Sequence, residues 1–162
     1  MTMDGITIAE KIAEQVGKIG EKIDITDYAL LSAETVVAYN HSNGKVGVLV
    51  AMNKKGEAVE TVGKDVTMQI AAMSPIAIDK NDVPEEVKTR EMEIGREQAR
   101  AEGKPEAILE KIATGKLEAY FKDATLLNQK FVKDNSKSIR DVLTAVDKDL
   151  TVTAFKRIGL GA

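Results

Sequence analysis

The pattern of hydrophobic and polar positions begins with an amphipathic segment at residues 6–23. Its apolar residues share one face of a 3.6-residue period: Ile8, Ile12, Val16, Ile19 and Ile23. This spacing predicts a helix with a single apolar face. Thr7 and Glu10 fit a capping box at its start, and Gly20 fits a left-handed C-terminal cap. We therefore expect the helix to end near Ile19.

The next pattern is that of a β-hairpin centred on Asn43-Gly44. Two apolar, β-branched runs, 35–41 and 45–53, flank this dipeptide. Asn-Gly favours a two-residue turn because both turn residues must adopt positive φ. The second run has almost no polar face, which indicates a strand that is covered on both sides or lies in the middle of a sheet.

Four further segments complete the expected core. Two are strands, at 25–33 before the hairpin and at 151–158, where the chain should return to the sheet of the hairpin. Two are short helices, at 64–73 and 138–146, which we expect to pack near that sheet.

Residues 82–127 carry a different pattern, which predicts two antiparallel helices. The first helix should begin at a capping Asp82, and it is heavily charged. Its few apolar residues lie at heptad spacing: Val87, Ile94 and Ala101. Gly103 ends it, and Pro105 starts a second helix with a stronger apolar stripe. Because the first helix is too polar to be buried on several sides, the pair should project from the body and pack chiefly on itself.

Together these elements predict an α+β fold. Residues 1–81 and 128–162 should form a core with a small antiparallel sheet of three to four strands packed with helices. Residues 82–127 should form an inserted antiparallel helical hairpin, or coiled coil. A chain of 162 residues buries about two-thirds of its unfolded surface, so this core needs no disulfide or metal to be stable.

Composition narrows the classes of function. The chain has no cysteine, which removes disulfides and thiolate chemistry and suits a reducing compartment such as the cytoplasm. Charged residues make up 30% of the chain, yet the net charge is only −3, and this balance argues against direct nucleic-acid binding. No apolar run approaches the roughly 20 residues of a membrane span, so we expect no membrane association.

Candidate chemistry is sparse. His41 is the only histidine, and without cysteine a metal site would need carboxylates alone, so we expect no metal and no cofactor. Gly63-Lys64 lacks the following Ser or Thr and the earlier glycine of a phosphate-binding loop, so a helix is the better interpretation. From the residues alone, His41 is an exposed loop side chain, and the protein works by binding rather than as an enzyme.

Several long runs closely resemble the bacterial type of translation elongation factor Ts. They are KIGEKI, YNHSNGKVGVLV, GKDVTMQIAAMSPIAIDKNDVPEEV, EGKPEAILEKIATGKL and LLNQKFVKDNSKSIRDVL. The similarity extends from about Lys18 to Ile158. The resemblance implies an α+β fold with two related core subdomains and an inserted coiled coil. The present sequence matches the second subdomain, also called the dimerisation domain, together with the insertion.

Two parts of the family pattern have no counterpart in this sequence. One is the small N-terminal docking domain, and the other is a Thr-Asp-Phe-Val motif that disturbs the magnesium site of the partner GTPase. Thr26-Asp27-Tyr28-Ala29 is similar at first glance. It follows GEKID, however, and so belongs by position to a later segment. We therefore do not identify it as that motif.

The resemblance implies a guanine-nucleotide exchange factor that binds elongation factor Tu in the cytoplasm during protein synthesis. Four residues stand at family contact positions: Ile19, Gly20, His41 and Val132. Two alternatives remain open. One is a homodimerising helical-hairpin module without exchange activity. The other is a small hydrolase that uses His41 with a carboxylate such as Asp27, which would require a concave pocket around the histidine.

Overall fold

A computed structural model describes residues 2–41 and 44–160 of the chain. The chain divides into two compact units, Met1–Leu30 and Leu31–Ala162. The sequence-based division placed residues 1–30 within the core, whereas they form a unit of their own.

The first unit is built around helix α1, Ile8–Ile19. Strands β1 (Thr2–Met3) and β2 (Ile6–Thr7) form a small antiparallel pair before it. The predicted capping box of Thr7 and Glu10 is confirmed, and so is the left-handed cap at Gly20, where φ is 76°. The amphipathic helix therefore has the predicted ends, although none of its residues is buried.

The strand predicted at 25–33 is wrong. Residues 20–34 form neither helix nor strand, and the apolar side chains of Ile25, Tyr28 and Leu30 are exposed. A strand needs a neighbour that satisfies its backbone N–H and C=O groups, and hydrophobic alternation does not by itself provide one. This segment has the composition of a strand, but in the described structure it does not pair with another strand.

The second unit contains the predicted antiparallel sheet. Its strands are β3 (Thr35–His41), β4 (Val46–Met52) and β7 (Val152–Gly159), in the order β3-β4-β7. Central strand β4 pairs with both neighbours, as its lack of a polar face indicated. In the turn, Gly44 has the expected positive φ of 76°, whereas Asn43 lies outside the described residues.

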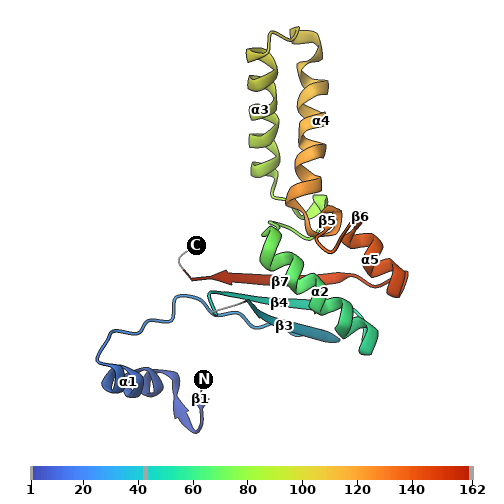
Figure 1. Ribbon diagram of the computed structural model, residues 1–162. Coiled ribbons are helices and arrows are strands. Elements are labelled where there is room, and N and C mark those ends of the chain that lie inside the picture. Colours follow the sequence, from blue (N-terminus) through green and yellow to red (C-terminus); the bar gives the residue numbers. More distant parts are fainter. Residues whose placement is uncertain (1, 42–43, 161–162) are drawn as a thin grey trace. The chain divides into compact units, whose positions relative to one another are not determined.

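Helix α2, Glu57–Met73, lies across one face of this sheet (Figure 1). It begins seven residues before the predicted start at Lys64, because Gly63 continues the helix instead of preceding it. A methyl group at Gly63 would meet Val37 Cγ2 at 2.6 Å, so the helix approaches β3 closely at this position. Helix α5, Ile139–Val146, also packs on α2, and its N-cap is Ser138. The core combines alternate residues of the sheet with these helices: Val48, Val50, Met52, Val66, Ile70, Ile139, Leu143 and Val152.

The predicted helical hairpin consists of α3 (Glu85–Ala101) and α4 (Glu106–Ala124), and it stands away from the sheet (Figure 1). Gly103 makes the tight turn with φ 73°. Asp82 was expected to cap α3, but it lies in a 3₁₀ turn, η1 (Lys80–Asp82), whose cap is Asp79. Helix α3 begins after Pro84 without a side-chain cap.

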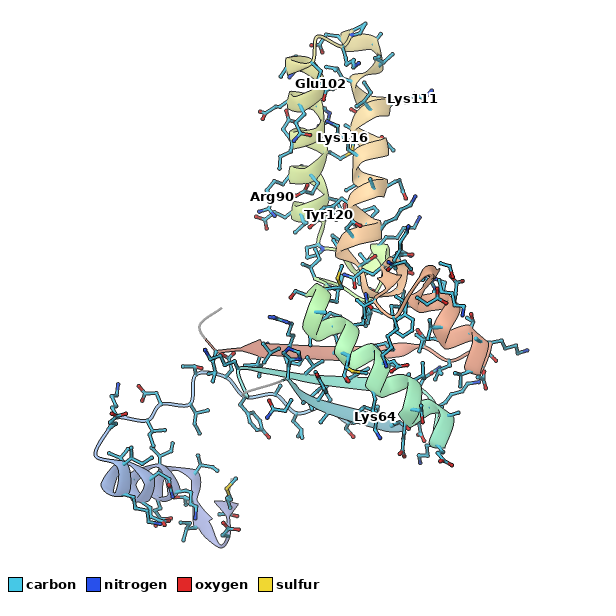
Figure 2. The ribbon with its side chains drawn as sticks, in the orientation of Figure 1. Lys64, Arg90, Glu102, Lys111, Lys116 and Tyr120 are labelled. Carbon is cyan, nitrogen blue, oxygen red and sulfur yellow. The ribbon has the colours of Figure 1, made fainter. Side chains whose placement is uncertain are left out.

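The two hairpin helices meet through small side chains. Helix α3 buries Gly95 and Ala99, and not the expected heptad residues. A Cβ atom at Gly95 would lie 3.1 Å from Ala113 Cα, so the helix axes approach closely here. Charged pairs bridge the helices along the edges: Arg96–Glu110 at 2.9 Å, Arg100–Glu106 at 2.8 Å and Lys116–Glu102 at 3.9 Å. Figure 2 shows Lys116 and Glu102 on the two facing helices.

The two ends of the hairpin lie side by side at its base. Ala77 forms a parallel bridge with Thr125, and the N–H of Leu126 donates to Ala77 O at 2.9 Å. A small second core of Ala77, Val83 and Phe121 covers this junction. The chain thus leaves the core and returns to it at nearly the same place.

Between the hairpin and α5 lies a segment whose fold the sequence pattern did not predict. It contains a 3₁₀ turn, η2 (Leu126–Asn128), followed by two short antiparallel strands, β5 (Lys130–Phe131) and β6 (Asp134–Ser138). The strands are too short to show a hydrophobic period, which explains why they were missed.

Candidate partner-binding site

His41 is the last residue of β3, and its side chain is exposed. Tyr39 lies two residues earlier, on the same face of the strand. The Tyr39 hydroxyl is 2.9 Å from His41 Nδ1, and the two ring centroids are 5.8 Å apart. This contact orients the imidazole at the mouth of the β3–β4 turn while leaving it accessible to another protein.

Val132 lies in the turn between β5 and β6. Its side chain is 43% exposed, although it is apolar. Its backbone N–H donates to Gln69 Oε1 on α2 at 2.9 Å. The turn is therefore attached to the core through the backbone of Val132, and the side chain faces outward.

Beside Val132 is an open groove of about 420 Å³. It is lined by the end of α2, the last turns of α4 and the β5–β6 segment, and Met73 is a second large exposed apolar side chain on its wall. Lys122, Asp123 and Asn135 supply polar groups at the same groove. An exposed valine and methionine next to such groups form a surface of mixed polarity, typical of protein interfaces.

Ile19 and Gly20 lie at the end of α1, in the first unit. Ile19 is 57% exposed, and the N–H of Gly20 donates to Val16 O at 2.8 Å, which ends the helix. The four predicted site residues are thus all exposed. Ile19 and Gly20 are adjacent at one helix end, whereas His41 and Val132 lie on different elements of the second unit.

Two buried side chains next to Val132 were missed at the level of sequence. Gln69 and Gln129 are almost completely buried, and their side chains are hydrogen-bonded to each other. The signal for Gln69 was present, because it is a polar residue directly beside Ile70 on the buried side of α2. A polar side chain at such a position needs partners inside the protein.

The geometry gives the hydrolase alternative no support. His41 Nδ1 is bonded to the Tyr39 hydroxyl, and not to a carboxylate. Within residues 2–41 and 44–160, no three His, Cys, Asp or Glu side chains are grouped to hold a metal ion. In the same part of the chain, we find no helix whose length and apolar character would let it span a membrane.

The described residues define an α+β protein: a three-stranded antiparallel sheet covered by a helix on one face, with a long helical hairpin inserted between α2 and the last strand. The family model described as "Elongation factor TS" matches residues 1–162. The chain therefore belongs to the elongation factor Ts family, and the resemblance seen in the sequence is confirmed.

Similar proteins named elongation factor Ts come from several bacteria. The protein of Cytophaga hutchinsonii is 60% identical over 97% of this chain, and that of Amoebophilus asiaticus is 52% identical over 100%. The protein of Flavobacterium psychrophilum is 45% identical over 98%. These matches cover 57%, 59% and 58% of the three relatives, so the chain spans a little over half of their length.

Proposed function

We propose that this chain binds elongation factor Tu, as part of a guanine-nucleotide exchange factor that acts in protein synthesis in the cytoplasm. Family membership supports this proposal. The observation that carries it is the exposure of the four family contact positions, Ile19, Gly20, His41 and Val132. Two of them are apolar side chains that remain accessible, Ile19 and Val132. Covering such side chains with a partner removes apolar surface from water, and this stabilises the complex.

Exchange of this kind requires no covalent chemistry. A factor that binds the nucleotide-free GTPase more tightly than the nucleotide-bound form must weaken nucleotide binding by the same coupling free energy. Each tenfold loss of nucleotide affinity requires about 1.4 kcal/mol of that preference. The protein therefore acts by selective binding and not as an enzyme.

The 162-residue chain by itself should bind weakly and release little GDP. Its sequence carries no Thr-Asp-Phe-Val motif, and Thr26-Asp27-Tyr28-Ala29 lies in the irregular segment 20–34. Magnesium and phosphate contacts hold a nucleotide in such GTPases. Without a side chain that disturbs those contacts, the chain has little means of preferring the empty partner.

Release of a fluorescent GDP analogue from elongation factor Tu, followed by stopped flow, tests this proposal. We expect measurable binding of the chain by calorimetry and little acceleration of release. Stimulation as strong as that by a full-length relative would contradict the second expectation. No binding at all would contradict the first.

The contribution of His41 can be measured separately. We expect His41→Ala to weaken binding without lowering the free energy of unfolding by more than about 0.5 kcal/mol, because the side chain is exposed. Asn40→Ala is the matched control. It alters the neighbouring exposed residue, whose side chain lies on the opposite face of β3. If the two substitutions weaken binding equally, His41 makes no specific contribution to the proposed contact surface.

A second candidate function is self-association through the hairpin. Ile94 on α3 and Ile108 on α4 are 39% and 41% exposed, although most of the surrounding surface is charged. This alternative predicts a concentration-dependent dimer in sedimentation equilibrium, which Ile94→Lys disrupts. It also predicts no binding to elongation factor Tu, and this distinguishes it from the exchange function.

A further inference from the structure

Two carboxamide side chains are buried next to the turn that carries Val132. Gln69 lies on α2, Gln129 directly follows η2, and their exposed fractions are 0% and 1%. A buried amide gives up its hydrogen bonds to water, so an apolar residue would fill either position without that cost. The hydrogen-bond partners of the two amides therefore indicate which role in the structure offsets this cost.

The two amides connect three separate parts of the chain. Gln69 Oε1 accepts the N–H of Val132 at 2.9 Å. Gln69 Nε2 donates to Lys130 O at 3.0 Å and to Gln129 Oε1 at 3.1 Å. Gln129 Nε2 donates to Asp123 O, in the last turn of α4, at 2.7 Å. The network joins α2, the β5–β6 turn and the base of the helical hairpin.

The backbone partners determine how both amides are oriented. The N–H of Val132 can only donate, so the Gln69 atom that faces it must be the oxygen. The carbonyls of Lys130 and Asp123 can only accept, so each must face an NH₂ group. These requirements leave Gln129 Oε1 facing Gln69 Nε2, as observed. Neither amide can be reversed without breaking bonds to the backbone.

Besides this network, the burial of Phe131 in the main core and an ion pair between Lys133 and Asp65 on α2, at 2.7 Å, attach the β5–β6 segment to the rest of the unit. The strands of this segment pair at only two positions, with an irregular register between them. A hairpin of this size is at best marginally stable by itself. The side chain of Val132 remains 43% exposed in the free protein. Among these contacts, the bond from the Val132 N–H to Gln69 acts directly on the backbone of Val132, so it restrains where that side chain points.

We propose that Gln69 and Gln129 are positioning residues for partner binding: their buried amide pair holds Val132 in its binding orientation beside the groove at the base of the hairpin. This inference rests on the proposed binding of elongation factor Tu. A contact residue that is already ordered loses less conformational entropy on binding. Because Gln129 also bonds to α4, the same pair fixes the position of the turn relative to the base of the helical hairpin.

The test compares three single variants of the 162-residue chain and one double variant. Gln69→Leu has a similar size and removes all three hydrogen bonds of the Gln69 amide. Val132→Ala removes the contact side chain. Thr67→Val is the matched control, since Thr67 is also 0% exposed on α2, but its hydroxyl donates to Lys64 O within the same helix. Affinity for elongation factor Tu is measured by calorimetry at a temperature where every variant is folded. Amide hydrogen exchange at Val132 is measured by NMR.

We expect Gln69→Leu to weaken binding by on the order of tenfold, the size of effect that the loss of an energetically important contact residue has. The double variant Gln69→Leu/Val132→Ala should bind no more weakly than Val132→Ala does. In Gln69→Leu the amide of Val132 should lose its protection from exchange, while amides in β4 keep theirs. Thr67→Val should change neither the affinity nor the exchange at Val132.

Several outcomes would overturn the inference. They are unchanged affinity of folded Gln69→Leu, additive effects of the two substitutions, or a Val132 amide that stays protected. If Val132→Ala itself binds normally, the proposed contact is wrong, whereas the exchange measurement still decides whether Gln69 holds the turn. Should Gln69→Leu fail to fold, Gln129→Leu tests the other half of the pair, because it removes the bonds to Gln69 and Asp123 and leaves the bond from Gln69 to Val132 intact. We then expect a smaller loss of affinity and a Val132 amide that keeps part of its protection, and unchanged affinity would overturn the role of Gln129.

Discussion

At the scale of single residues, Gly63 determines how closely α2 can approach the sheet. A Cβ atom there would lie 2.6 Å from Val37 Cγ2 and 3.1 Å from Met52 Sδ. Glycine costs up to about 1 kcal/mol in a helix interior relative to alanine. The close packing of α2 on β3 and β4 offsets this cost, because a larger residue would collide with the side chains of Val37 and Met52.

Gly63→Ala should therefore destabilise the chain despite the better helix propensity of alanine. We expect the free energy of unfolding in urea to fall by roughly 1–3 kcal/mol, the usual effect of overpacking. Gly115→Ala in α4 is the control. A Cβ atom there meets nothing within 4 Å, so stability should rise by up to about 1 kcal/mol. A neutral Gly63→Ala would show that the Val37 side chain moves aside easily.

Asp134, at the start of β6, is the clearest electrostatic feature among the described residues near Val132. The Ser136 hydroxyl, the Lys137 ammonium and the Ser136 N–H stabilise its carboxylate and lower its pKa to about 2. Since the unfolded pKa is higher, near 3.9, this interaction stabilises the fold above pH 3.9. The contribution is lost as the pH falls through about 2.

A titration of the Asp134 carboxyl carbon by NMR measures this shift. We expect Ser136→Ala to raise the pKa of Asp134 toward its ordinary value, because the Ser136 hydroxyl is the largest cause of the shift. Lys137→Gln should raise the pKa less. If Lys137→Gln has the larger effect, the ion pair and not the hydroxyl holds the carboxylate in its charged form.

At the scale of elements, the helical hairpin is attached to the core through one narrow junction. Backbone hydrogen bonds join Ile76 to Ala124 and Ala77 to Leu126, so the two ends of the hairpin are adjacent. Asp79 strengthens the junction, since its carboxylate accepts from Asn128 at 2.7 Å and pairs with Arg140 at 2.6 Å. Burial raises the pKa of Asp79, but the bonds from Asn128, the Lys80 N–H and Arg140 together outweigh it and lower the pKa below its ordinary value. All three of these residues lie outside the hairpin helices.

We predict that the hairpin can be removed without unfolding the core, as an insertion should allow. Replacing residues 83–124 with a short Gly/Ser linker should leave cooperative thermal unfolding, because the ends already lie together and the main core lies outside this segment. The shortened chain should lose some stability, since Ala77 is no longer covered by Val83 and Phe121. Non-cooperative melting would mean that the hairpin supplies surface to the main core.

At the scale of the whole molecule, the boundary between the two units along the chain falls within the irregular segment 20–34. Lys22 lies in this segment, and its side chain is 84% exposed. Proteases cleave exposed irregular backbone before helices and strands, because the chain must enter the active site in an extended form.

Brief treatment with trypsin should therefore cut first after Lys22, as mass spectrometry of the products would show. Exposed lysines also lie in the short connections between paired or packed elements, for example Lys45, Lys133 and Lys148. The bond after Lys104 is protected from trypsin by Pro105. Lys22→Gln should slow the first cleavage several-fold. First cuts within α2 or β4 would contradict the division into two compact units.

The sequence by itself determined those elements whose signals are local. The ends of α1 followed from Thr7, Glu10 and Gly20, because caps act within one turn of the chain. The strands at 35–41, 45–53 and 151–158 followed from β-branched runs and a turn dipeptide. The exposure of His41 was also predicted from its position beside the turn.

The tertiary structure decided whatever depended on residues distant in the sequence. The run at 25–33 has the composition of a strand, but pairing depends on a neighbour that only the fold provides. The contact between α3 and α4 runs through Gly95 and not through the expected heptad residues. The two helices lie so close together that only a small residue fits between them at this point. The bond between Gln69 and Val132 spans 63 positions, and no periodic pattern encodes such a pair. Local patterns thus determine helix ends and hairpins, whereas long-range packing decides which strands find a partner and which side chains meet.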